Sequence, residues 1–173
     1  NLSTFAAYKA GLTEDTTTGT TFYDDVDTLT AQVDVEFIQQ QYGTASIGYL
    51  IFLPVEGASY SILHYLEDGG NYLNEFSCLY LYDSYAAEKT YNSPTVYAHE
   101  ILHLFGAADL YVGSRDTFVT QPLAQYVLNT WPDAIMYYTY NSDNGISYDH
   151  IEKTLCPLTA YRLGLVDSFP GSE

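Results

Sequence analysis

Basic residues are scarce in this chain, whose 173 residues include 5 lysines and arginines against 22 aspartates and glutamates. The formal net charge of −17 argues against nucleic-acid binding, because phosphate contacts need a basic surface. The same charge disfavours docking on an anionic membrane surface. It should repel acidic substrates at low ionic strength, whereas neutral and basic peptides remain suitable partners.

Long apolar segments are also missing. The longest apolar run, Ile47 to Val55, has the length of a strand, and no run approaches the roughly 18 residues of a membrane span. We therefore expect no transmembrane segment. The chain starts at Asn1 without a methionine or a signal-like segment, which is typical of a mature or truncated form.

Cysteine occurs only twice, as Cys78 and Cys156. Two cysteines can form one disulfide in a secreted protein or remain two buried thiols. Cys78 lies in a strand-like run, where a buried apolar thiol is the commoner outcome. We favour free thiols and leave the pairing open.

The most informative segment that is present runs from His99 to Asp109 and reads HExxHxxGxxD. His99 and His103 lie four residues apart, so on a helix they project from one face and can hold one metal ion. Glu100, beside the first histidine, is then placed to take a proton from a metal-bound water. This spacing is a signature of zinc hydrolases.

The end of the same segment supplies a third ligand. Gly106 lets the chain leave the helix in a left-handed conformation and turn back. Asp109 can then return to the metal as an oxygen ligand. Three protein ligands with one position left open are the arrangement of a catalytic zinc rather than a structural one.

Local sequence predicts a helix for the histidines. Ser93 and Pro94 resemble an N-cap followed by proline at the first helical position. An apolar stripe is expected to face the core, with the metal ligands on the opposite side of the helix. The residues of this stripe are Tyr97, Ile101, Leu104 and Phe105.

The remainder of the chain predicts one α+β domain, since hydrophobic residues make up 47% of it and the length suits a single core. The expected order is a helix ended by Gly43, a small mixed sheet, the metal-binding helix above a cleft, and a mostly helical C-terminal half. The expected strands are residues 47–53, 59–66 and 76–82, and the other expected helices are residues 24–42, 122–129 and 151–165.

Other titratable residues have structural interpretations. His64, in a strand-like run, is expected to be a core or edge histidine, and His150 a surface or structural one. Glu152 is an alternative third ligand, because another class of zinc peptidase takes its third ligand from a glutamate on a later helix. The spacing of Gly106 and Asp109 makes that alternative unnecessary.

The motif residues and Met136 resemble those of the metzincin clan of zinc metallopeptidases. In that clan a methionine turn lies under the metal, some tens of residues past the helix, and Met136 follows Asp109 by 27 residues. The resemblance implies one catalytic domain over residues 1–173, with an upper half at about 1–106 and a lower half at about 107–173. Most clan members have histidine as third ligand. The aspartate variant is similar to the snapalysin-like and immune-inhibitor-A-like peptidases.

By position, the resemblance implies that His99, His103 and Asp109 bind Zn²⁺ and that Glu100 is the general base. It further implies that Tyr138, at Met-x-Tyr, stabilises the oxyanion. A structural role for Tyr138 competes with this assignment, because the chain has 19 tyrosines.

The expected function is that of a secreted or cell-surface zinc endopeptidase, monomeric and acting on peptide or protein substrates. The alternative is a catalytically weak zinc-containing binding or adhesion domain with the same fold. The glutamate that follows His99 favours the enzyme, because a purely structural metal does not need that residue.

Overall fold

The computed structural model describes residue 26 and residues 29–43, 47–63, 75–140 and 147–168. The chain packs as two compact units, Asn1–Lys89 and Thr90–Glu173. The described elements confirm an α+β fold with a small mixed sheet. The predicted single domain, its two halves and the cleft between them stay predictions. All residues of the candidate site belong to the second unit.

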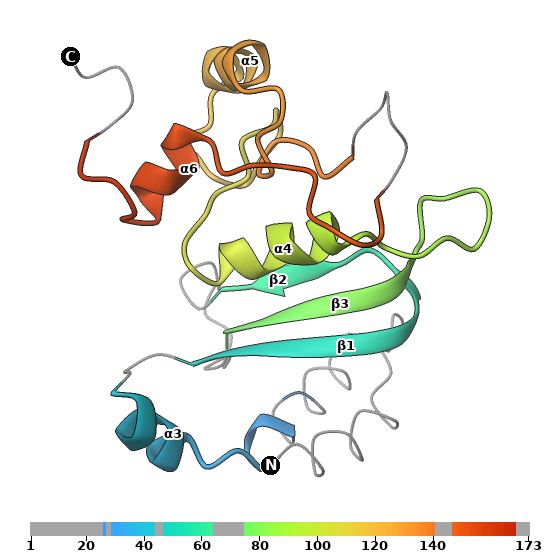
Figure 1. The fold of residues 1–173 in the computed structure, drawn as a ribbon, viewed down its shortest axis with the longest axis vertical. Helices are drawn as coiled ribbons and strands as arrows, with labels where there is room; N and C mark the ends of the chain where they lie inside the picture. The colour runs from blue at the N-terminus through green and yellow to red at the C-terminus, as the bar shows by residue number, and fades with distance from the viewer. Residues whose placement is uncertain (1–25, 27–28, 44–46, 64–74, 141–146, 169–173) are drawn as a thin grey trace. The chain divides into compact units, whose positions relative to one another are not determined.

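The sheet of the first unit has three strands, β1 (Gly48–Gly57), β2 (Tyr60–Ile62) and β3 (Glu75–Asp83). Strand β3 lies in the middle, parallel to β1 and antiparallel to β2 (Figure 1). All three strands were expected from the apolar runs. The second one is shorter than its predicted range, of which residues 64–66 lie outside the described part of the chain.

Alternate positions of β1 and β3 form the core of this unit, as the period of two along a strand requires. The buried cluster consists of Val26, Leu29, Ile51, Leu53, Phe76, Cys78 and Tyr80. Gly57 allows a close approach at the end of β1, because a Cβ atom there would overlap the ring of Tyr80. The hydroxyls of Ser61 and Ser77 pair at 2.8 Å and join β2 to β3.

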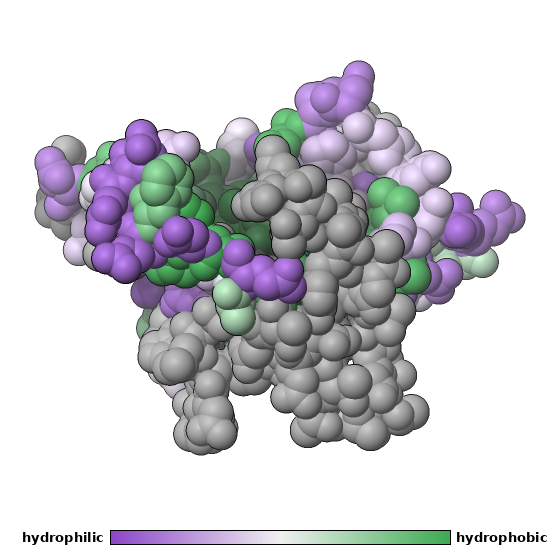
Figure 2. All heavy atoms as spheres, turned by 90° about the horizontal axis from the view of Figure 1, so that it is seen from below, coloured by the Kyte–Doolittle hydropathy of each residue, from purple (hydrophilic) through white to green (hydrophobic). Residues whose placement is uncertain are grey.

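Helix α3 (Val35–Tyr42) is shorter than the predicted helix 24–42. The backbone turns at residues 31–33, and the carboxylate of Asp34 then caps a new helix by accepting the N–H of Phe37 at 2.9 Å. Gly43 ends α3 in the left-handed conformation, as predicted. The described residues of α3 are all at least partly exposed, and Figure 2 shows hydrophilic and hydrophobic side chains side by side on the surface of α3.

The second unit contains α4 (Pro94–His103), α5 (Gln121–Thr130) and α6 (Pro157–Arg162). Helix α5 confirms the prediction for residues 122–129. The predicted helix 151–165 is wrong in its first part, because Thr154 forms a backbone bridge with Ala134. Helix α6 starts only at Pro157, which lacks an N–H and keeps the preceding residue extended.

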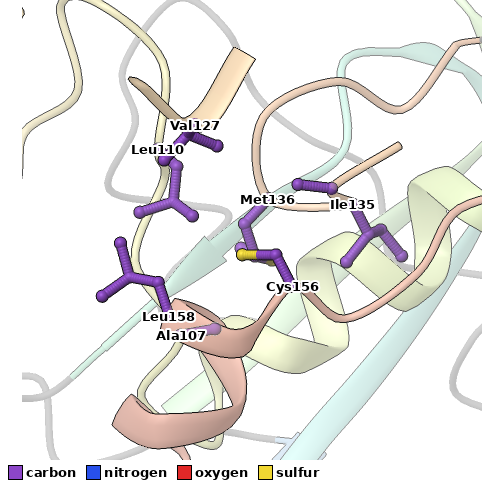
Figure 3. Close-up of a cluster of buried hydrophobic side chains, with 8 residues drawn as sticks. Ala107, Leu110, Val127, Ile135, Met136, Cys156 and Leu158 are labelled. Carbon is purple, nitrogen blue, oxygen red and sulfur yellow. The ribbon is translucent and has the colours of Figure 1, made fainter. Parts of the chain in front are cut away.

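A separate hydrophobic cluster forms the core of the second unit (Figure 3). It joins the chain just after α4, α5, the segment around Met136 and the start of α6. Backbone hydrogen bonds between Ile135 and Thr154 and between Thr154 and Asp133 hold this segment in place. The buried members are Ala107, Leu110, Val127, Ala134, Ile135, Met136, Cys156 and Leu158.

Two further expectations concern cysteine and membranes. Cys78 and Cys156 are both buried free thiols, which confirms the preferred alternative. Among the described helices, none has the length and apolar character needed to cross a bilayer.

Candidate metal centre

Helix α4 begins where the sequence predicts. Ser93 is its N-cap with an extended backbone, and Pro94 is its first residue. The prediction of its buried side is wrong for Phe105, which is 71% exposed. The other three residues of the predicted stripe are partly buried, whereas His99 and Glu100 on the opposite side are buried. The face of α4 that carries His99 is covered by the loop of Asp109 and by the turn of Ile135. Polar residues therefore lie on a buried side of the helix, which a hydrophobic pattern alone would assign to solvent. The apolar residues of α4 that pack against the core of this unit are Ala98 and Leu102.

The end of α4 redirects the chain toward the histidines. Gly106 has a φ of 93°, which L-residues with a side chain rarely adopt. The N–H of Gly106 donates to the carbonyl of His103 at 2.8 Å, and the N–H of Ala107 donates to Leu102 at 3.1 Å. These bonds close a helix end of the Schellman type. The predicted reversal at Gly106 is confirmed, and it leads Asp109 back to the ligand face.

Three side-chain atoms meet at this point, as the motif predicted. The Nε2 atoms of His99 and His103 lie 3.2 Å apart. Oδ1 of Asp109 lies 3.1 Å from Nε2 of His99 and 3.4 Å from Nε2 of His103. A tetrahedron with metal–ligand bonds of about 2.0–2.1 Å has edges of about 3.3–3.4 Å. The triangle of donor atoms therefore has the size of one face of a tetrahedral zinc site.

The hydrogen bonds of the two rings decide which nitrogens carry lone pairs. Nδ1 of His99 lies 2.9 Å from the carbonyl oxygen of Ile135, and Nδ1 of His103 lies 2.8 Å from that of Ala107. A carbonyl only accepts, so both Nδ1 atoms carry hydrogen and both neutral rings present bare Nε2 lone pairs. A backbone carbonyl behind a ligating histidine is the usual device that fixes its orientation.

Asp109 Oδ1 completes the arrangement. This oxygen is buried and has no partner in acceptable hydrogen-bond geometry among the described residues, although both Nε2 atoms lie close to it. Three lone-pair-bearing atoms that face one another repel unless a proton, a cation or another donor lies between them. The donor set of two imidazoles and one carboxylate fits Zn²⁺.

The ionisation of the site shows the same demand for positive charge. Burial alone lowers the pKa of His103, but the adjacent Asp109 carboxylate, the carbonyl of Ala107 and the charge of Glu100 outweigh burial, and the pKa is raised. Burial alone raises the pKa of Asp109, but the contacts with His103 and His99 hold it well below its usual range. In the metal-free chain a proton can supply the charge, and a bound cation would displace that proton.

Glu100 belongs to the same site. It is buried, and its charge contributes to the raised pKa values of both His103 and Tyr111. Its role as a general base stays a prediction. Glu100 therefore lies where the motif predicted, within electrostatic reach of the donor atoms.

Tyr111 is a site residue that the sequence analysis missed. Its hydroxyl donates a hydrogen bond of 2.9 Å to Oδ2 of Asp109, the oxygen that faces away from the histidines. Burial and the Asp109 charge raise the pKa of Tyr111, so the hydroxyl keeps its proton. The spacing Asp-x-Tyr was the available signal, but among so many tyrosines it did not stand out.

Met136 lies in a turn behind the ligands. The side chain is fully buried in the cluster of Figure 3, and the N–H groups of Tyr137 and Tyr138 donate to the carbonyl of Ala134. The carbonyl of Met136 accepts the N–H of Leu110 at 2.7 Å. The turn thus binds His99 on helix α4 through Ile135, and it binds the loop that carries Asp109 through Met136.

The remaining candidates lie in other surroundings. Tyr138 is 57% exposed, and its ring packs edge-on against Tyr137. No hydrogen bond joins Tyr138 to the three ligands within the described residues, so its role stays a prediction. His150 is an exposed partner of Asp149 and Ser147, which confirms a surface position. His64 lies outside the described residues.

Glu152 has a local structural role. One oxygen of its carboxylate accepts the N–H of Ser147 at 3.3 Å, and its own N–H donates to the hydroxyl of Thr95 at 3.3 Å. The carboxylate is thus used to close the turn 147–152. This placement favours Asp109 over Glu152 as the third ligand.

Comparison of the chain with protein-family models, with curated proteins and with solved structures found no match. The interpretation of the site therefore depends on its geometry and on the motif.

Proposed function

We propose that this chain is a zinc-dependent endopeptidase in which His99, His103 and Asp109 hold the metal. One observation carries the proposal. Three donor atoms lie 3.1–3.4 Å apart, and both histidine Nδ1 atoms are tied to carbonyls. A chance cluster of two histidines and an aspartate would not be expected to direct both Nε2 lone pairs and one carboxylate oxygen toward the same point.

The proposed chemistry is hydrolysis of a peptide bond. Zn²⁺ bound by this set would polarise the scissile carbonyl and acidify a water molecule. The carboxylate of Glu100 accepts the proton of the attacking water and later delivers it to the leaving amine. Glu100 directly follows the proposed ligand His99 and is buried. A buried carboxylate at this place favours a role in proton transfer over that of a surface charge.

The proposal extends to the class of peptidase. A HExxHxxGxxD motif, a chain reversal at Gly106 after the helix and a buried methionine turn together support a metzincin-like catalytic domain. In this proposal the protein is secreted or at the cell surface and cleaves peptide or protein substrates. The net charge of −17 favours neutral and basic peptides among them.

The test combines metal analysis with cleavage of a mixed peptide library, with and without a chelator. We expect about one zinc per chain, and cleavage that the chelator abolishes and added zinc restores. Glu100→Gln should keep the zinc and lose activity by about 10²–10⁴-fold, the typical cost of a lost general base. Glu152→Gln is the matched control, because that carboxylate closes a turn instead.

The outcomes separate the alternatives. A chain that binds zinc but cleaves no peptide in the library would be a zinc-containing binding domain. Cleavage at the parent rate by Glu100→Gln would remove this residue from the mechanism. Cleavage that persists in the chelated, zinc-free chain would refute the metal mechanism.

A further inference from the structure

The two oxygens of Asp109 have different surroundings. Oδ1 is buried and faces the Nε2 atoms of both histidines. Oδ2 accepts the hydrogen bond of the Tyr111 hydroxyl at 2.9 Å. The two oxygens therefore have different partners: Oδ1 is directed to the two histidines, and Oδ2 is held by the hydroxyl of Tyr111.

The backbone makes this division rigid. Leu110, between the two residues, is fully buried, and its N–H donates to the carbonyl of Met136 at 2.7 Å. Fixing Leu110 fixes the directions in which its neighbours Asp109 and Tyr111 leave the chain. Gly113 then turns the chain away with a φ of 91°. The Tyr111 contact is thus part of a loop whose backbone is anchored at Leu110.

A carboxylate can bind a cation through one oxygen or through both. Two-oxygen binding raises the coordination number and suits large, hard cations, whereas tetrahedral zinc needs one oxygen and an open fourth position. We infer that Tyr111 is a positioning residue that keeps Asp109 a one-oxygen ligand, and thereby selects zinc over cations of higher coordination number. The inference depends on the proposed metal site, which it deepens.

The hydroxyl itself, and not the bulk of the ring, is the active group. Replacing Tyr111 by phenylalanine removes one donor and keeps the ring. Because Tyr111 is 39% exposed, this change should disturb the packing little. Without that donor, Oδ2 is free to rotate toward the cation and add a fifth bond. Partners of this kind typically contribute about 10–100-fold in metal affinity.

The experiment uses Co²⁺ as a spectroscopic probe in the full chain. Four-coordinate Co²⁺ absorbs visible light strongly, and the band weakens when a fifth ligand binds. We expect an intense band for the parent and a weaker, shifted band for Tyr111→Phe. The preference for Zn²⁺ over Mn²⁺, measured by competition, should fall by roughly 10–100-fold. Tyr161→Phe, which removes a hydroxyl from a residue of equal overall exposure on α6, should behave as the parent.

The inference is overturned if Tyr111→Phe gives the parent Co²⁺ spectrum and the parent metal preference. Tyr111→Leu, which also lacks the donor, must show the same spectral change if the phenylalanine variant folds poorly. A parent chain that binds neither Co²⁺ nor Zn²⁺ would refute the metal site itself, which is a different failure. Unchanged cobalt spectra in a chain that does bind zinc refute only the role of Tyr111.

Discussion

Nδ1 of His99 donates a hydrogen bond of 2.9 Å to the carbonyl of Ile135, the residue before the buried Met136. A proposed metal ligand on helix α4 is thus oriented by a turn 36 residues further along the chain. The same turn accepts the N–H of Leu110, which follows the ligand Asp109. Packing around the turn is therefore expected to affect the geometry of the candidate metal site.

Replacing Met136 tests this coupling. Met136→Ala should lower the free energy of unfolding by about 2–5 kcal/mol, because it leaves a cavity in a fully buried position. Met136→Leu nearly conserves the volume and should cost less than about 1.5 kcal/mol. Urea unfolding measures both values, and zinc competition should show weaker binding in the alanine variant than in the leucine variant. Equal zinc affinity in the two variants would separate the turn from the metal centre.

The two histidines of the motif should differ from the others in zinc binding. His103→Ala removes one of three ligands and should nearly abolish binding. His150→Ala is the matched control, because His150 is exposed and pairs with Asp149. Metal content after dialysis measures the difference. A loss of zinc as large in His150→Ala as in His103→Ala would refute the assignment of the ligands.

Much of the site follows from short-range sequence. His99 and His103 lie four residues apart, so about one turn of helix brings their side chains together. Gly106 supplies the reversal by its positive φ, and Asp109 follows within three residues. A motif of eleven consecutive residues therefore brings the three side chains close together, and sequence alone predicts this proximity, whereas the orientation of the His99 ring also depends on the distant Ile135.

The features that sequence analysis missed depend on contacts between distant segments. The buried side of α4 is set by Ile135 and by the loop that returns Asp109, which no helical pattern contains. The late start of α6 follows from the bridge between Thr154 and Ala134. Tyr111 binds Asp109 in a loop whose Leu110 is held by the turn around Met136.

The third ligand can be tested by two substitutions at one position. Asp109→Ala should weaken zinc binding by more than the roughly 10–100-fold typical of outer-shell partners, because it removes a bond to the metal. Asp109→His should retain more zinc than Asp109→Ala, since imidazole is also a good ligand. Competition with a chromogenic chelator ranks the variants. Normal binding by Asp109→Ala would place the third ligand elsewhere, and Glu152 would be the next residue to replace.

Tyr138 is the remaining residue for which the clan resemblance implies a catalytic role. It lies two residues past Met136, is 57% exposed, and packs edge-on against Tyr137. An exposed hydroxyl can swing toward a bound substrate, and a donor aimed at a developing oxyanion is worth up to about 10²–10³-fold in rate.

Tyr138→Phe removes only that hydroxyl, so the expected result is a lower kcat with KM nearly unchanged, because the interaction forms mainly in the transition state. Tyr140→Phe is the matched control from the same stretch of chain. The measurement is steady-state cleavage by variants shown to hold zinc. If zinc-loaded Tyr138→Phe has the kcat of the parent, the catalytic role is refuted, and packing against Tyr137 remains as the role of Tyr138.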